Sequence, residues 1–337
     1  MTEAAVARPL TVSVALCTWN GAEFLRTQLR SICLQTRPPM EIVLSDDASA
    51  DDTVALARRI VDECLTERPG LIIELRTLVN AQALRVTRNF EQAASACRGD
   101  LIALSDQDDA WVPDKLERMV ARFEASPELT LLHTDARLVD GGGEPLGGTL
   151  FHALEVTPAE LERIHGGRAF DVFLRRNLVT GATAMFRREL LAHARPFPPE
   201  WVHDEWLGAI AAATGRVDVL EQPLIDYRQH GRNQIGARRD TLREKLHKAL
   251  ASRGNTHVER AHKAQQLMER LEALGAAAKP GLVEQVRGKL EHQRFRARLP
   301  ASRVARCWPV LREAMTGRYE LYGRGVRGIV RDLFEGV

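Results

Sequence analysis

Short apolar runs alternate with segments of helical spacing between Val12 and Leu104, and this alternation limits the fold more than any other feature. The runs are Val12–Leu16, Ile42–Leu44, Leu71–Leu75 and Leu101–Leu104. Each has the length of a buried strand, while the segments between them repeat apolar residues every three or four positions. Strands and helices that alternate in this way form βαβ units. We therefore predict an α/β fold with a mostly parallel sheet flanked by helices.

Two of these runs lead directly into carboxylates. Leu101–Leu104 is followed by Asp106, Asp108 and Asp109, and Ile42–Leu44 by Asp46 and Asp47. Ligands of open α/β sheets bind at the carboxyl ends of the strands. Three carboxylates this close repel one another, but Mg²⁺ or Mn²⁺ would bind among them. From the residues alone, a solvated acidic turn that caps the following helix explains Asp106–Asp109 equally well, and helix capping also explains Asp46 and Asp47.

Several function classes are disfavoured by motifs that the chain lacks. No G-x-G-x-x-G or G-x-x-x-x-G-K-[ST] motif follows a strand, which argues against dinucleotide and P-loop phosphate binding. The five cysteines are scattered and include no C-x-x-C pair, which favours a reducing compartment. The first residues lack the apolar core of a signal peptide, and no apolar stretch approaches the roughly 18 residues of a spanning helix. We expect a cytoplasmic protein.

The net charge of +2 hides a difference between the two parts of the chain. From Asp240 onward there are 20 Lys and Arg against 11 Asp and Glu, a net charge of +9, which leaves −7 for residues 1–239. We predict a catalytic domain at 1–239 and a basic α-helical region at 240–337. Basic amphipathic helices can lie on anionic lipid, although a solvated bundle or an oligomer contact explains them equally well. Nucleic-acid binding is the least favoured use, because the body is acidic.

Six motifs, taken together and in order, resemble the family 2 glycosyltransferases of the GT-A fold. Within that family the chain is most similar to the bacterial rhamnosyltransferase-like branch, over roughly residues 11–236. The motifs are Cys17–Gly21, Ser45–Ser49, Asp106–Asp109 with Trp111–Leu116, Gly181–Thr183, His203–Asp204, and Tyr227–Gly231.

The resemblance implies a Rossmann-like GT-A domain with a C-terminal helical extension, a divalent metal (Mg²⁺ or Mn²⁺), and a nucleotide-sugar donor such as a UDP- or dTDP-sugar. The metal would be held by Asp106 and Asp108, with Asp109 and His230 as further ligands. His230 could instead pair with the diphosphate, as could Arg228, or face solvent. The residues implied for the donor nucleotide are Thr18, Asn20, Asp46, Asp47, Arg88 and Asp106, of which Asp47 is favoured for the base and ribose.

The same resemblance implies inversion at the anomeric carbon by single displacement, which needs a base for the acceptor hydroxyl. Asp204 matches that position, and the adjacent Glu205 is the alternative. Gly181 and Thr183 are expected under the acceptor, unless they only form a tight turn before a core strand. Trp206 could stack on a sugar, although tryptophan is more often buried.

We therefore predict a hexosyltransferase that acts in surface polysaccharide synthesis, such as O-antigen synthesis. Its acceptor would be a glycan or a lipid-linked molecule at the inner face of the membrane, where the chain could associate peripherally. No nucleic acid is expected as a partner, and the oligomeric state stays open. Two rival functions are a nucleotidyltransferase, disfavoured because Thr18–Gly21 has no lysine, and a catalytically silent scaffold, disfavoured because all the acids are present.

Overall fold

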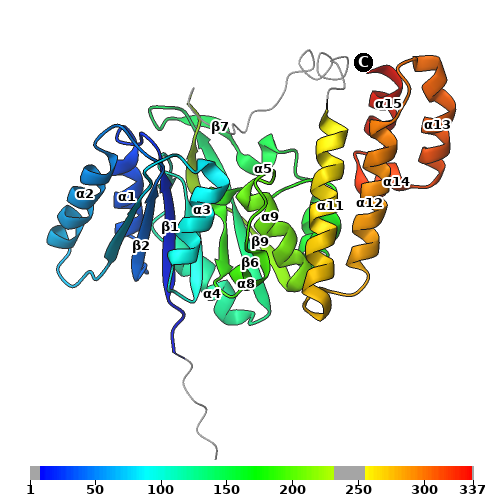
Figure 1. Ribbon diagram of the computed structural model, residues 1–337. Coiled ribbons are helices and arrows are strands. Elements are labelled where there is room, and N and C mark those ends of the chain that lie inside the picture. The colour runs from blue at the N-terminus through cyan, green and yellow to red at the C-terminus, as the bar shows by residue number, and fades with distance from the viewer. Residues whose placement is uncertain (1–7, 231–254, 336–337) are drawn as a thin grey trace, which may run out of the picture.

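The computed structural model describes residues 8–230 and 255–335 of the chain (Figure 1). A mixed β-sheet with helices on both faces occupies one side of the molecule, and the C-terminal helices stand beside it. The strands are β1 Val12–Thr18, β2 Glu41–Asp46, β3 Glu74–Val79, β4 Leu101–Ser105, β5 Ala110–Trp111, β6 Leu129–Val139, β7 Pro145–Thr149, β8 Met185–Arg187 and β9 Arg216–Arg228.

The helices include two short 3-10 turns. In order they are α1 Leu25–Cys33, α2 Thr53–Glu67, α3 Arg85–Ala96, α4 Lys115–Ala125, α5 Leu150–Ala153, α6 Pro158–His165, α7 Ala169–Phe173, η1 Gly181–Thr183, α8 Leu190–Ala194, α9 His203–Thr214, α11 Thr256–Leu274, η2 Gly275–Ala277, α12 Leu282–Ala297, α13 Arg303–Met315, α14 Arg318–Tyr322 and α15 Val326–Phe334. None of these described helices combines the length and apolar composition needed to cross a lipid bilayer.

The strand order is β3-β2-β1-β4-β8-β6-β9-β5, with β7 paired to β6. The α/β class and the flanking helices are confirmed, but the sheet is less parallel than expected. The first four strands of this order are parallel, as the βαβ pattern predicts. β8 then runs antiparallel to both β4 and β6, and β5 and β7 also pair antiparallel. These later strands lack the regular strand–helix spacing from which a parallel sheet was predicted.

The structure differs locally from the sequence pattern. The third strand begins at Glu74, not Leu71, because its pairing with β2 starts there and leaves Ile72 85% exposed. The separate apolar runs at 217–220 and 224–227 form one continuous β9. Gly147 and Gly148 lie in β7, where backbone pairing with β6 includes this segment in the sheet.

Alternating strand residues bury apolar side chains on both faces of the sheet, as expected for strands covered by helices on each side. Val14 and Leu16 pack with α1, α2 and α4, while Ala15 and Cys17 pack with α3 and α7–α9. This places the carboxyl ends of β1, β2 and β4 side by side at one edge. The same register brings Thr18 of β1 opposite Asp46 of β2.

Helices α11 and α12 add to the apolar core on the face of the sheet that α3 and α7–α9 cover. Leu267 and Leu271 of α11 and Val286 of α12 belong to the same apolar cluster as α3 and α9. The predicted boundary at 239/240 lies outside the described residues and stays a prediction. The buried contacts nevertheless show that these two helices share a core with the sheet.

Candidate functional site

The acidic loop, defined as residues 106–109, follows β4 and reaches the edge formed by the carboxyl ends of the strands. Asp106 and Asp108 keep partial solvent exposure, whereas Asp109 is buried. One oxygen of Asp109, Oδ1, accepts the backbone N–H of Arg228 at 3.0 Å. The other, Oδ2, is buried without a hydrogen-bond partner. A buried carboxylate oxygen left unpaired is costly, so it points to a ligand that would bind there.

His230, at the end of β9, joins this loop. Its Nε2 lies 2.8 Å from Asp108 Oδ2, and its ring stacks on Phe24 with centroids 4.7 Å apart. The side chain is only 13% exposed. The solvent-facing alternative for His230 is therefore wrong, and the side chain belongs to the carboxylate cluster.

Arg228 is close to the same loop but points its charge elsewhere. Its Nε donates to the carbonyl of Asp108 at 2.7 Å and its Nη1 to the carbonyl of Gly141 at 2.9 Å. The side chain is buried and lies against the Phe24 ring. These contacts make Arg228 a support for the acidic loop, and its expected role in diphosphate binding stays a prediction.

The acidic loop holds several carboxyl groups close together at a site with little access to water. Burial, followed by the charges of Asp108 and Asp204, raises the pKa of Asp106. Burial, followed by the charges of Asp108 and Asp106, raises the pKa of Asp109 well above its usual range. A bound cation would reverse both shifts, since it favours the ionised form of a carboxyl group.

Lys115 is the cation that sequence reasoning missed, although the motif Trp111–Leu116 contains it. Its ammonium is fully buried, donates to the carbonyl of Ala182 at 2.9 Å and lies 3.7 Å from the centre of the Trp111 ring. Burial lowers the pKa of Lys115 to about 7, against the opposing pull of Asp109 and Asp106. Its place two positions after Pro113, at the start of the helix that follows the acidic loop, was the available signal.

The acidic loop has the charge and donor atoms that fit a hard divalent cation. Asp106, Asp108 and His230 offer oxygen and nitrogen atoms, and the unpaired Oδ2 of Asp109 lies beside them. Among the residues that the structure describes, the one set of three such side chains with ligand atoms within 4.8 Å is elsewhere, at His257, Asp332 and Glu335. Those two carboxylates are bonded to Arg296 and Arg331, which already supply positive charge there.

The second acidic strand end is held by its own hydrogen bonds. Asp46 accepts the hydroxyl of Thr18 at 2.8 Å and both the N–H and hydroxyl of Ser49. Asp47 accepts the backbone N–H groups of Leu84 and Arg85, which shape the entry to α3. Asp47 thus caps the start of α3 and not α2, the helix that follows Asp47 in the chain. Neither finding tests the donor-binding roles.

Two other residues expected at the donor lie at the borders of this edge. Asn20 has a φ of 46° and its Oδ1 accepts the N–H of Ala50, which closes the turn after β1. Gln107 was missed by sequence reasoning: its side-chain amide bonds both the N–H and the carbonyl of Trp19, and so ties this turn to the acidic loop. Arg88 is exposed and lines a hollow along α3 with Leu84 and Arg195.

Asp204 opens α9 and is nearly buried. Its Oδ2 accepts the N–H of Gly181 at 2.8 Å, and its Oδ1 lies 3.3 Å from the amide nitrogen of Asn177. Burial raises its pKa to about 6, with the charge of Glu205 adding to the effect and the hydrogen bonds opposing it. A carboxylate with this pKa is suited to accept a proton near neutral pH.

Glu205 points away from Asp204 toward the C-terminal helices. Its carboxylate lies 2.6 Å from the ammonium of Lys263 on α11. Lys263 also lies 5.3 Å from the centre of the Trp201 ring. This ion pair with α11 favours Asp204 over Glu205 as the base, and both assignments stay predictions.

Of the residues expected under the acceptor, Gly181 contacts Asp204 directly, through the hydrogen bond from its backbone N–H. A Cβ at Gly181 would lie 2.5 Å from His203 Nε2, so the close approach needs glycine. Thr183 is fully buried and donates to the carbonyl of Thr180, which fits the tight turn before β8. Trp206 is also fully buried, and its indole N–H donates to the carbonyl of Ala194. The tight-turn alternative for Thr183 and the buried alternative for Trp206 thus fit the structure, and their acceptor roles stay predictions.

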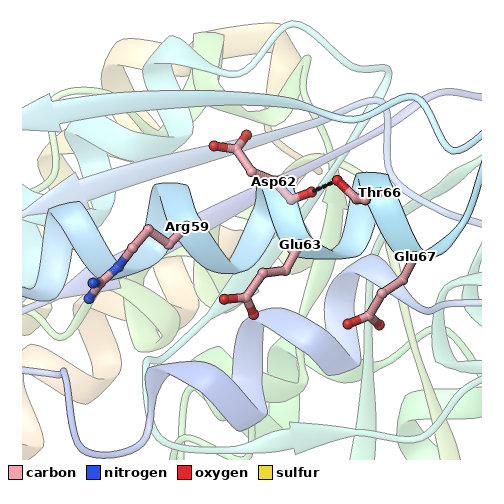
Figure 2. A pocket seen from close by; sticks show the side chains of 5 residues that line it. All are labelled: Arg59, Asp62, Glu63, Thr66 and Glu67. Carbon is pink, nitrogen blue, oxygen red and sulfur yellow. Dashed lines mark hydrogen bonds between the residues drawn. The ribbon is translucent and has the colours of Figure 1, made fainter.

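A hollow elsewhere on the surface carries no comparable chemistry. Figure 2 shows it along the outer side of α2, lined by Arg59, Asp62, Glu63, Thr66 and Glu67. Glu63 and Glu67 are paired there with arginines of α1. We interpret it as a solvated helix surface.

Comparison with known proteins places this geometry in a family. The model named "Glycosyl transferase family 2" matches residues 13–194, more than half of the chain. The chain belongs to glycosyltransferase family 2. The protein Rv1520 of Mycobacterium tuberculosis, described as uncharacterized, is 27% identical over 226 residues, which cover 65% of this chain and 59% of that protein. The match thus spans less than two thirds of such relatives. The O-antigen biosynthesis protein RfbC of Myxococcus xanthus is 34% identical over 137 residues, 40% of this chain and 10% of that protein.

Solved structures share the fold. Residues 1–349 of Staphylococcus aureus TarS, solved with UDP-GlcNAc, superimpose with a TM-score of 0.58 at 15% identity, covering 85% of this chain and 73% of that one. The mannosyltransferase PcManGT of Pyrobaculum calidifontis, solved with GDP-Man and Mn²⁺, gives a TM-score of 0.53 at 19% identity, covering 92% and 77%. At these identities the likeness establishes the GT-A-like fold alone.

Proposed function

We propose that this glycosyltransferase is an inverting, metal-dependent enzyme that transfers a hexose from a nucleotide-sugar. The acceptor we propose is a glycan or lipid-linked molecule of surface polysaccharide synthesis, reached at the cytoplasmic membrane surface. The observation that carries the proposal is the acidic loop, where an unpaired buried oxygen of Asp109 lies in a cluster with Asp106, Asp108 and His230. Nucleotide-sugars in the solved relatives TarS and PcManGT, and Mn²⁺ in the second, support the donor class and the metal.

In this mechanism Asp106, Asp108 and His230 would hold the divalent cation. The cation supplies the positive charge that stabilises a departing nucleoside diphosphate. Arg228 and Gln107 keep the loop in position through their bonds to Asp108 and Trp19. The ammonium of Lys115 offsets part of the negative charge of Asp106 and Asp109.

Asp204 would take the proton of the acceptor hydroxyl as the sugar transfers. Its hydrogen bonds from Gly181 and Asn177 fix the carboxylate while burial keeps it basic. Burial alone would protonate the group, and the two donors favour the charged form, so their balance sets a pKa suited to a base. The effect of Asp204 on Asp106 indicates that base and acidic loop lie near each other.

The test measures nucleoside diphosphate release from a panel of nucleotide-sugars with Mn²⁺ or Mg²⁺ and candidate acceptors. We expect Asp108→Asn to lose both transfer and metal-dependent nucleotide binding. Asp204→Asn should lower transfer by about 10²–10⁴-fold while donor binding, followed by thermal shift, persists. Asp62→Asn, on the exposed side of α2, is the matched control and should behave as wild type.

Full transfer by Asp108→Asn would overturn the metal assignment. Transfer by Asp204→Asn at the wild-type rate would show that Asp204 is not the base. A chain that binds donors but transfers to no acceptor, in wild type as in the variants, would indicate a silent scaffold.

A further inference from the structure

Helix α13 presents an apolar stripe to solvent. The α13 stripe consists of Val304, Trp308, Leu311 and Met315, whose exposed fractions are 83%, 70%, 53% and 75%. These residues recur every three or four positions and so share one side of the helix. The buried residues of α13, Arg306, Val310 and Glu313, lie on its opposite side. The stripe therefore faces directly away from the protein.

The stripe is not needed to hold α13 in place, because the opposite side of the helix does so. The guanidinium of Arg306 donates to the carbonyls of Asp332 and Glu335 on and beside α15. Glu313 bonds His292 of α12 at 2.8 Å, and Val310 lies in a small apolar core with Leu299 and Tyr319. Apolar residues this exposed are rarely gathered in one row on a soluble surface without a partner.

Helix α15 carries a second exposed apolar row. Val326, Val330 and Phe334 are 67%, 49% and 55% exposed and lie one turn apart. Figure 1 shows α13, α14 and α15 at the end of the molecule farthest from β1 and β2. Two of these three helices, α13 and α15, thus carry an exposed apolar row.

The charges around these rows are almost all positive at the surface. Between residues 300 and 335, the described chain has exposed Arg303, Arg312, Arg324 and Arg327, whereas Glu313, Asp332 and Glu335 are buried. Asp332 is held by the guanidinium of Arg296 and the hydroxyl of Tyr319. Glu320 is the exposed carboxylate of this segment. Folding thus buries the acids and leaves the arginines outside.

We propose that the α13 stripe and its arginines bind the surface of an anionic lipid bilayer, with Trp308 at the level of the headgroups. An apolar row flanked by arginines, with tryptophan among its members, has the composition of helices that lie in a membrane interface. A second copy of this chain fits less well. In a two-fold interface the same surface would face itself and bring arginines together, with Glu320 as the exposed carboxylate to pair with them.

This inference does not depend on the proposed function, because it rests on α13 and its surroundings alone. It adds to that function by bringing the enzyme to the surface where a lipid-linked acceptor would be found. Transfer to a soluble acceptor should not require the stripe, so membrane binding and catalysis can fail separately.

The first experiment is co-sedimentation of the full chain with phosphatidylcholine vesicles, with and without about 30% phosphatidylglycerol. We expect wild type to bind the anionic vesicles at least about tenfold more tightly, with binding that weakens as salt rises. The triple variant Trp308→Ser, Leu311→Ser, Met315→Ser should lose at least about tenfold of the affinity for anionic vesicles. Arg303→Glu with Arg312→Glu should lose the preference for anionic lipid.

Ile72→Ser with Leu146→Ser is the matched control, because these apolar residues are also exposed but belong to β7 and the segment before β3, away from α13. It should bind as wild type. Unchanged thermal unfolding of all variants would show that they fold. A second measurement uses Cys307, the exposed cysteine beside Trp308, since the other four are buried. An environment-sensitive fluorophore on Cys307 should shift to the blue when anionic vesicles are added.

Absence of wild-type binding to anionic vesicles would overturn the proposal, as would wild-type binding by the triple variant. A wild-type dimer in solution that the triple variant converts to a monomer would also overturn it and assign the stripe to a second copy.

Discussion

At the scale of single residues, Asp204 shows how one side chain is prepared for proton chemistry by its surroundings. Its backbone partner Gly181 comes from the turn before β8, and its own position at the start of α9 removes it from water. Burial raises the pKa, and the hydrogen bonds limit the rise to about 6. The same environment must therefore affect stability as well as catalysis.

We predict that transfer and stability depend on pH in opposite directions through Asp204. As a base it must be ionised, so activity should rise as pH increases through about 6. An acid whose pKa is raised by folding binds its proton more tightly in the folded state, so stability contributed by Asp204 is lost as pH rises from about 4 to about 6. Above that range the loss is constant and reaches at most about 3 kcal/mol.

The measurement compares urea unfolding of wild type and Asp204→Asn at pH 4 and pH 8. The variant does not titrate, so its stability relative to wild type should increase by about 2–3 kcal/mol between the two pH values. An unchanged difference would show that Asp204 has an ordinary pKa. Asp62→Asn, which is exposed, should show little change.

At the scale of elements, the segment from β4 through the acidic loop to α4 works as one unit. Lys115, at the first position of α4, is placed under the loop that β4 presents. Its charge partly offsets Asp106 and Asp109, so the loop and the helix start depend on each other. Removing the ammonium should leave the buried carboxylates uncompensated.

We predict that Lys115→Met destabilises the fold by about 1–3 kcal/mol at neutral pH, because it removes the hydrogen bond to the buried carbonyl of Ala182 and the charge that offsets Asp106 and Asp109. Asp109→Asn, combined with Lys115→Met, should recover part of that loss. Chemical unfolding of both single variants and the double variant gives the coupling energy. Additive effects would mean that Lys115 and Asp109 do not interact. Because Lys115→Met retains most of the side-chain volume, a cavity would contribute little.

How much could be predicted from the sequence also follows from the elements. Periodicity alone placed Asp106 and Asp108 at the carboxyl ends of the strands, because both residues follow directly after a clear apolar strand. The capping box formed by Thr157 and Glu160 at the start of α6 is likewise a local pattern of four consecutive residues. Resemblance was needed for Asp204 and His230, which come from distant elements. The burial of Trp206, the pairing of Glu205 with Lys263 and the direction of the Arg228 guanidinium depend on tertiary packing that no local pattern encodes.

At the scale of the whole molecule, the difference in charge between the two parts of the chain coexists with a shared core. The ion pair of Glu205 with Lys263 and the bond from Trp201 Nε1 to Gln266 join α9 and its preceding loop to α11. Lys279 also donates to the carbonyl of Ala212 at the end of α9. Helices that bury their apolar side against the catalytic domain should not unfold independently of it.

We predict that the chain unfolds in one cooperative transition and that Leu267→Ala destabilises all of it. Leu267 is 3% exposed on α11 and packs in the core that includes α3 and α9, so its truncation should lower the free energy of unfolding by about 2–5 kcal/mol. Far-ultraviolet circular dichroism and the near-ultraviolet signal of the buried Trp206 should change together in denaturant. Leu311→Ala, at an exposed position of α13, is the matched control and should stay within about 0.5 kcal/mol of wild type. Two separate transitions, with Leu267→Ala moving only the earlier one, would instead support independent domains on either side of the predicted boundary at 239/240.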